Sequence, residues 1–160
     1  MKPVVCDTGP VNYLIQIEGI EVLNHLFTPV FLPQACHLEL LQPKAPVAVR
    51  EWASQLPAWM SSLEANQDPV VSTAGLSHAD TEVLVRAVER NAVVLMDDLS
   101  GRNHAKSLGL RVIGTLGVVE LAARRQLLSL REAISRLQQT NIRISEDLYR
   151  QVIERNQFLR

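Results

Sequence analysis

Two short apolar runs, each followed directly by aspartate, constrain the fold of this chain more than any other feature. Residues 4–6 precede Asp7, and residues 92–96 precede the pair Asp97 and Asp98. Runs of this length without polar residues are typical of strands that are buried on both faces of a parallel sheet. Open α/β sheets bind their ligands at the carboxyl ends of such strands, so we expect the three aspartates at a binding edge.

The remaining segments alternate between strand and helix signals. The clearest helix covers residues 77–91, with Ser77 as its cap, Asp80 at the third position and Asn91 suited to a left-handed end. Further strands are expected at 30–32, 59–63 and 111–113, and further helices at 10–16, 21–26, 34–41, 45–56, 101–108, 114–125, 127–139 and 145–158. The polar segment 64–75 is expected to form a loop. This alternation predicts an α/β fold with a central parallel sheet covered on both faces.

Size and composition favour one globular domain that spans residues 1–160. No apolar run approaches the length of a membrane span, and the N-terminus lacks the pattern of a secretory signal. The two cysteines, Cys6 and Cys36, do not make a disulfide framework. We therefore expect a cytoplasmic protein that is not associated with a membrane.

Charge is distributed unevenly along the chain, although the net charge is only −1. Residues 1–85 contain three Lys or Arg and nine Asp or Glu, whereas residues 86–160 contain thirteen and eight. An acidic half beside an Arg-rich half is compatible with a metal site next to a group of phosphate-binding residues. The candidates for phosphate binding are Arg102 and Lys106. Alternatively, these basic residues only keep the faces of the late helices solvated.

Further carboxylates lie near the starts of, or along, the expected helices that follow other strands. Glu39 lies on the helix expected at 34–41, and Asp80 and Glu82 lie at the start of the helix at 77–91. We hypothesise that these acids and the pair at 97–98 converge on Mg²⁺ or Mn²⁺, hard cations that prefer oxygen ligands and activate water for phosphodiester hydrolysis. Two carboxylates about 4 Å apart repel each other by roughly 4 kcal/mol at an effective dielectric constant of about 20. A bound cation offsets that cost.

Each acid also has a structural explanation. Asp7 can cap the first helix, and Asp80 stands at capping-box spacing from Ser77. Glu39 and Glu82 can face solvent, which is the commoner situation for an acid on a helix. The hypothesis therefore rests on the whole set of acids.

Short motifs along the chain resemble those of the PIN-domain superfamily, most closely its VapC-like bacterial and archaeal branch. They lie at residues 7–10, 33–40, 80–82, 95–98, 101–102, 109–117 and 142–145, which is nearly the whole chain. The resemblance implies a three-layer α/β/α PIN-like fold with a parallel sheet and a cluster of acids at the strand ends. It also implies a Mg²⁺- or Mn²⁺-dependent endoribonuclease that hydrolyses RNA. Such proteins are commonly the toxin of a type II toxin–antitoxin pair, with an antitoxin protein as partner, and are often homodimers.

Carried over by position, the resemblance assigns roles to particular residues. The catalytic set is Asp7, Glu39, Asp80 and Asp98, of which Asp7, Asp80 and Asp98 match the metal-binding positions. Thr8 matches the hydroxyl position that orients the first aspartate. Asp97 is held in reserve for Asp98, and Glu82 completes the supporting residues.

Departures from the family pattern bear on activity. Gly9 stands where serine is frequent, Asp80 stands where this branch usually has glutamate, and Leu99 follows the last acid in place of an aromatic residue. A catalytically weak or inactive PIN-like module that binds a protein partner is therefore the alternative to a nuclease.

Overall fold

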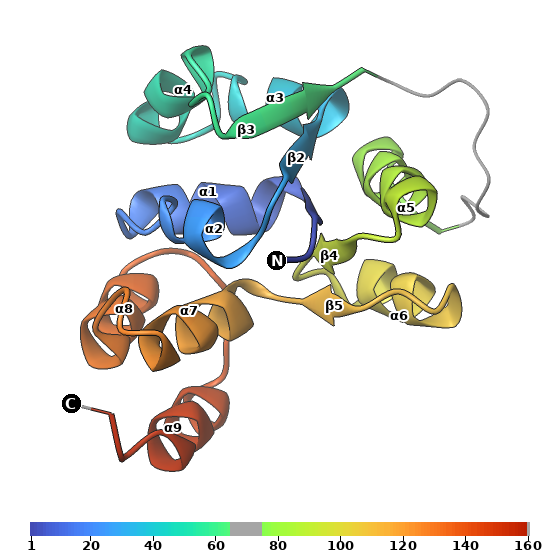
Figure 1. Cartoon of the computed structure of the whole chain (residues 1–160). Coiled ribbons are helices and arrows are strands. Elements are labelled where there is room, and N and C mark those ends of the chain that lie inside the picture. The colour runs from blue at the N-terminus through green and yellow to red at the C-terminus, as the bar shows by residue number, and fades with distance from the viewer. Residues whose placement is uncertain (65–74, 160) are drawn as a thin grey trace.

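A parallel sheet occupies the centre of the structure, a computed structural model that describes residues 1–64 and 75–159 (Figure 1). Within these residues the sheet has five strands in the order β3-β2-β1-β4-β5, and every neighbouring pair is parallel. The strands are β1 (Val4–Cys6), β2 (Val30–Pro33), β3 (Met60–Leu63), β4 (Val93–Leu95) and β5 (Val112–Ile113). The predicted strands are therefore present, and the segment expected as an edge strand at 59–63 is indeed at one edge.

Helices cover both faces of the sheet. They are α1 (Thr8–Gln16), α2 (Val22–Leu26), α3 (Gln34–Leu40), α4 (Val47–Ser54), α5 (His78–Arg90), α6 (Leu99–Ser107), α7 (Thr115–Arg124), α8 (Leu130–Gln138) and α9 (Glu146–Arg155). The chain passes outward from β1 to β2 and β3, and then returns past β1 to β4 and β5. Because such crossovers are right-handed, α1 to α4 lie on one face and α5 and α6 on the other, as Figure 1 shows. The predicted three-layer α/β/α fold is confirmed.

The last three helices extend the layer that contains α1. Helices α7 and α8 pack beside α1, and α9 packs against α8. Within the described residues, no helix has both the length and the apolar character that a membrane span requires.

Strands β1 and β4 form the buried middle of the sheet. Every side chain of both strands is buried. In contrast, the edge strand β3 exposes Ser61 and Ser62. The position of β1 and β4 between two layers of helices explains their uninterrupted apolar runs, since neither of their faces reaches water.

The strand order creates a crevice at the carboxyl ends of β1 and β4. From β1 the chain continues to β2 on one side, whereas β4 pairs with β1 on the other side. Cys6 pairs with Leu95, and the amide of Asp7 donates a hydrogen bond to the carbonyl of Leu95 at 2.9 Å. The chain therefore leaves both strands side by side, at the topological position where open α/β sheets bind ligands.

Capping side chains set the helix starts, and some differ from the prediction. Helix α6 begins two residues before its predicted start because Asp98 Oδ2 accepts a hydrogen bond from the amide of Gly101 at 2.8 Å. Helix α8 begins three residues after its predicted start because Ser129 accepts one from the amide of Glu132. Helix α5 ends as predicted, with Asn91 in the left-handed conformation at φ 48°. The loop expected at 64–75 lies almost entirely outside the described residues.

Helix α9 is attached to α7 through one carboxylate. Glu120 on α7 accepts hydrogen bonds from Arg155 at 2.6 and 2.8 Å and from Asn156 at 2.9 Å. The hydrogen bond from Arg155 is the main cause that holds the pKa of Glu120 below its ordinary value. Tyr149 and Val152 of α9 are buried in the core. The last helix is thus fixed to the body of the fold.

We predict that Gly101→Ala lowers the free energy of unfolding by about 1–3 kcal/mol, the usual cost of overpacking. A Cβ at Gly101 overlaps the sulfur of Met96, which is fully buried. This cost exceeds the gain of about 1 kcal/mol in helix propensity. Urea unfolding measures the change. The control is Gly9→Ala in α1, where an added Cβ meets no atom within 4 Å, and an equal loss in both variants would contradict the packing argument.

Candidate functional site

Asp7 lies at the carboxyl end of β1 in the buried centre of the sheet. It stands at the N-cap position of α1, but its side chain makes no capping hydrogen bond, so the capping explanation is wrong for this residue. Asp7 is only 8% exposed, and this burial is the main cause that raises the pKa of its carboxyl group to about 7. The charges of Asp80 and Glu39 also raise this pKa, whereas a hydrogen bond from the amide of Thr8 lowers it.

Asp80 brings a second carboxyl group to the same point. It lies in the first turn of α5, where Ser77 Oγ accepts a hydrogen bond from its amide at 3.1 Å. The side chain of Asp80 lies close enough to Asp7 for its charge to raise the pKa of the Asp7 carboxyl group. Burial, followed by the charge of Asp98, raises the pKa of Asp80. Helix capping by Ser77 and a place in the acidic cluster are therefore compatible.

The adjacent residues Asp97 and Asp98 make different contacts. Asp97 accepts hydrogen bonds from the amide and the hydroxyl of Thr115 at 2.8 and 2.6 Å, and so ties the end of β4 to the start of α7. Asp98 caps α6 through the amide of Gly101, and its charge acts on Asp80. The contacts therefore place Asp98 beside the acidic pair and give Asp97 a structural partner.

Glu39 is the fourth member of this series of neighbouring acids. It lies exposed on α3, and its charge acts on Asp7. Together with Thr8 and Gly9 it lines a cavity of about 330 Å³. We call the series of neighbours Glu39, Asp7, Asp80 and Asp98 the acidic cluster.

The thiol of Cys36 is a neighbour of Asp7 that the sequence did not indicate. Cys36 lies on α3, fully buried, and its Sγ donates a hydrogen bond to Asp7 Oδ1 at 3.7 Å. Burial, followed by the charge of Asp7, raises the pKa of this thiol well above its ordinary value, so it is a neutral donor. The buried hydroxyl of Thr8 lies near enough to the thiol to lower that pKa, although it makes no hydrogen bond of normal geometry within the described residues. A cysteine among apolar residues signals core packing only, which is why this contact was missed.

Glu82 does not face solvent, contrary to the expectation from its position on α5. It is only 4% exposed and forms an ion pair at 3.8 Å with Arg86, one turn later on the same helix. The apolar stripe of a helix indicates which face is buried, but it does not reveal that a flank is covered as well. Through this ion pair Glu82 supports α5.

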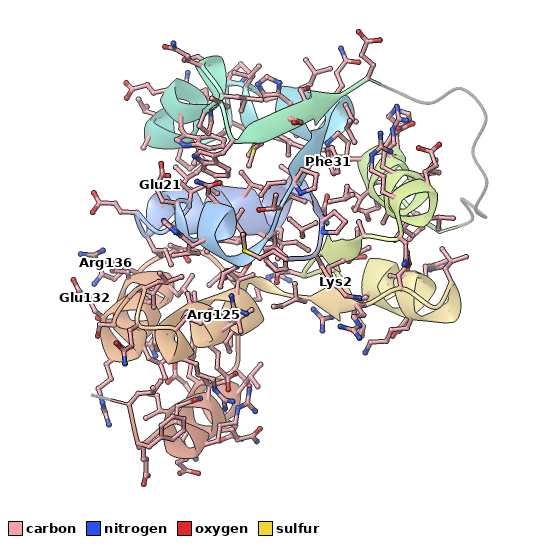
Figure 2. All side chains as sticks on the ribbon, viewed as in Figure 1. Lys2, Glu21, Phe31, Arg125, Glu132 and Arg136 are labelled. Carbon is pink, nitrogen blue, oxygen red and sulfur yellow. The ribbon has the colours of Figure 1, made fainter. Side chains whose placement is uncertain are left out.

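The two candidate phosphate-binding residues of α6 are separated in the structure. Arg102 lines a cavity of about 1000 Å³ that also borders Asp98, and its Nη1 donates a hydrogen bond to the carbonyl of Met96 at 3.0 Å. Lys106 lies in the last turn of α6 and does not line this cavity. Other arginines of the second half of the chain form ion pairs on helix surfaces. Arg136 pairs with Glu132 on α8 at 2.7 Å (Figure 2).

The donors of the acidic cluster suit a hard divalent cation in their chemistry. They are all oxygen atoms, and burial followed by the charges of neighbouring acids raises the pKa values of Asp7 and Asp80, a penalty that a cation relieves. As they lie, no three His, Cys, Asp or Glu side chains within residues 1–64 and 75–159 are grouped tightly enough to hold an ion. Binding of a cation would therefore require these side chains to rotate toward one another.

We predict that the metal-free protein becomes less stable as the pH rises from about 4 to about 7. The folded-state pKa of Asp7, about 7, lies above the ordinary value of 3.8. Its contribution is therefore complete below the unfolded pKa and is lost as the pH rises through about 7, by about 1.4 kcal/mol for each unit of the shift. Urea unfolding in chelator at several pH values measures the loss, which Asp7→Asn should remove. A decline of equal size in Asp7→Asn would refute this origin.

We also predict that Asp97→Ala destabilises the protein more than Asp98→Ala. The first change leaves the buried amide of Thr115 without its acceptor, which costs about 1–3 kcal/mol. The second removes a helix cap worth about 1 kcal/mol and relieves repulsion with Asp80. Thermal unfolding of both variants without metal makes the comparison. If Asp98→Ala were the less stable variant, Asp97 would not be the structural tie.

Comparisons with known proteins agree with this fold. A family model described as a PIN domain, DUF3368, matches residues 3–157. The structure is similar to that of a PilT N-terminus domain protein, SSO1118, from the hyperthermophilic archaeon Sulfolobus solfataricus P2. The TM-score is 0.52 and the sequence identity 14%, over 89% of this chain and 99% of the other, so this likeness bears on the fold alone. No curated protein gives a significant match. Because the family model matches nearly the whole chain, the protein belongs to the PIN-domain family, whose fold is of the nuclease type.

Proposed function

We propose that this PIN-domain protein is a metal-dependent endoribonuclease whose active site is the acidic cluster. The observation that carries the proposal is the neighbouring pair of Asp7, buried at the carboxyl end of β1, and Asp80, half-buried in the first turn of α5, each with a raised pKa. A structural role does not require two acids to be held together against the cost of desolvation and of charge repulsion. Mg²⁺ or Mn²⁺ bound there would lower the pKa of a water molecule and stabilise the charge that develops on a phosphodiester.

The contacts of each acid suggest how the work is divided. Asp7, Asp80 and Asp98 are electrostatic neighbours in series and would hold the cation. Glu39 is exposed, its charge acts on Asp7, and it would orient the attacking water and take its proton. The buried thiol of Cys36 fixes the orientation of Asp7 by donating to its Oδ1.

The surroundings of the cluster support a phosphodiester substrate. The larger cavity next to Asp98 is lined by Arg102, Arg143 and Arg155, and Arg143, which has no ion pair within the described residues, can balance the charge of a nucleic-acid backbone. RNA is proposed as the substrate because of the resemblance of the sequence motifs to VapC-like nucleases.

Within this proposal the chain acts as the toxin of a type II toxin–antitoxin pair, works in the cytoplasm and forms a homodimer. The support for these three points is the sequence resemblance. The mixed lining of the larger cavity, with Ile142, Ile144 and Leu148 beside its arginines, is also suited to a protein inhibitor.

We predict that Asp7→Asn and Asp98→Asn each abolish Mn²⁺-dependent cleavage of a single-stranded RNA while the protein stays folded. The loss should exceed the roughly 10–100-fold that follows removal of an outer-shell partner of a metal ligand. Cleavage of a labelled RNA, with and without a chelator, measures it. Glu21→Gln is the matched control, because this exposed acid lies at the start of α2 (Figure 2) and lines neither of the two cavities that border the cluster. Wild-type cleavage by Asp7→Asn would refute the assignment.

Titration with Mn²⁺ distinguishes the nuclease from the alternative, a PIN-like module that binds only a protein. A cation that binds the folded state raises the melting temperature in proportion to RT ln(1 + [L]/Kd). The wild type should show this increase and Asp7→Asn should not. If wild-type stability is independent of Mn²⁺ and no RNA is cleaved, the protein-binding alternative is correct.

A further inference from the structure

Two cavities flank the acidic cluster and share the same two lining residues. The larger, of about 1000 Å³, borders Asp98, and the smaller, of about 330 Å³, borders Thr8 and Glu39. Tyr13 and Asn141 line both. A polymer that passes along both cavities, with its reactive bond at the acids, must therefore pass over these two side chains.

Tyr13 and Asn141 form a defined contact although they are far apart in sequence. The hydroxyl of Tyr13 donates a hydrogen bond to Asn141 Oδ1 at 3.0 Å, which joins α1 to the segment between α8 and α9. Tyr13 is partly buried against the core, so its ring is held in place. Burial, followed by the charge of Asp97, raises the pKa of this phenol, and Arg143 lowers it. A partly buried aromatic ring therefore lies at the junction of the cavities, near both an acid and a cation.

The same face of α1 presents amide side chains to the smaller cavity. Thr8, Asn12 and Gln16 recur every four residues and all line it, as does Tyr13. Gln16 Nε2 donates a hydrogen bond to Asn12 Oδ1 at 3.1 Å. Amides carry both donors and acceptors and can therefore match the edge of a nucleobase, which a row of lysines cannot.

The larger cavity supplies a cation for the backbone of the polymer. Arg102 donates to the carbonyl of Met96, and Arg155 pairs with Glu120. In contrast, Arg143 forms no ion pair with any residue that the structure describes. Its guanidinium group is therefore available for a phosphate beside the ring of Tyr13.

We propose that Tyr13 and Asn141 form a nucleobase subsite, in which a base of a single-stranded RNA stacks on the Tyr13 ring next to the bond that is cut. The amides of Asn141 and Asn12 contact the edge of that base, and Arg143 binds its phosphate. The subsite selects the nucleotide at this position, and it rests on the proposed function. Stacking on aromatic rings with hydrogen bonds to exposed base edges is the usual way in which proteins read unpaired RNA.

The test measures RNA binding separately from cleavage. Fluorescence anisotropy of labelled single-stranded homopolymers is recorded with Asp7→Asn as the background, so that bound RNA is not cut. Tyr13→Ala should weaken binding by about ten-fold or more, as loss of one base stack does. Tyr13→Phe should keep most of the affinity, and both Tyr13→Phe and Asn141→Ala should change the preference among homopolymers. Asn141 is exposed, so this second variant tests the subsite even where Tyr13→Ala fails to fold.

Matched controls separate the subsite from general effects. Phe158→Ala removes an exposed aromatic residue that lines neither cavity, and Arg125→Ala removes an exposed arginine on the far end of α7 (Figure 2). Both should bind RNA as their parent does. Arg143→Ala should weaken all sequences alike and reduce the salt dependence of binding by about one phosphate contact.

The outcomes distinguish the subsite from the nuclease. Unchanged affinity and unchanged base preference in both Tyr13→Ala and Asn141→Ala overturn the subsite, even if the wild type cuts RNA, and leave the two cavities to a protein partner. If the variants lose RNA binding as expected but the wild type does not cleave with Mn²⁺, the proposed function fails and the subsite stands. Equal binding of a duplex and of its single strands also overturns the proposal.

Discussion

The burial of Asp7 among neighbouring acids is the constraint on which the rest of the site depends. A carboxyl group at the end of a fully buried strand loses its hydration, and the charge of Asp80 adds to the penalty, so the pKa of Asp7 is raised. The sheet can hold this arrangement because β1 and β4 are buried on both faces and paired in register. The stability lost at the acids is offset by apolar burial in the strands that carry them.

The tie between Asp97 and Thr115 determines how the end of β4 is presented. The carboxylate meets the amide at the start of α7, where the helix dipole favours negative charge. Gly114 is needed at this junction, because a Cβ there would lie 2.8 Å from Asp97 and 2.9 Å from Arg102. With Asp97 held in this way, its neighbour Asp98 is left at the first turn of α6, where its charge reaches Asp80. Of these two consecutive aspartates, Asp97 thus joins β4 to α7, whereas Asp98 belongs to the acidic cluster.

The helices that follow β5 add the second half of the binding surface. Glu120 fixes α9 to α7 by hydrogen bonds from Arg155 and Asn156. The segment before α9 contributes Asn141 and Arg143 to the larger cavity. The cavity wall opposite the acids is therefore built from the end of the chain, whereas the acids come from the strand ends and from α3 and α5.

Local sequence patterns determined the strands, most helices and the parallel sheet, because unbroken apolar runs report burial on both faces and capping residues report helix ends. They also placed Asp7 at the end of β1 and Asp80 in the first turn of α5. The burial of Glu82, the thiol of Cys36 against Asp7 and the pair Tyr13 and Asn141, 128 residues apart, depended on the tertiary structure. The physical reason is that each of these contacts joins or covers elements brought together by the crossovers, and no local periodicity records which surfaces meet.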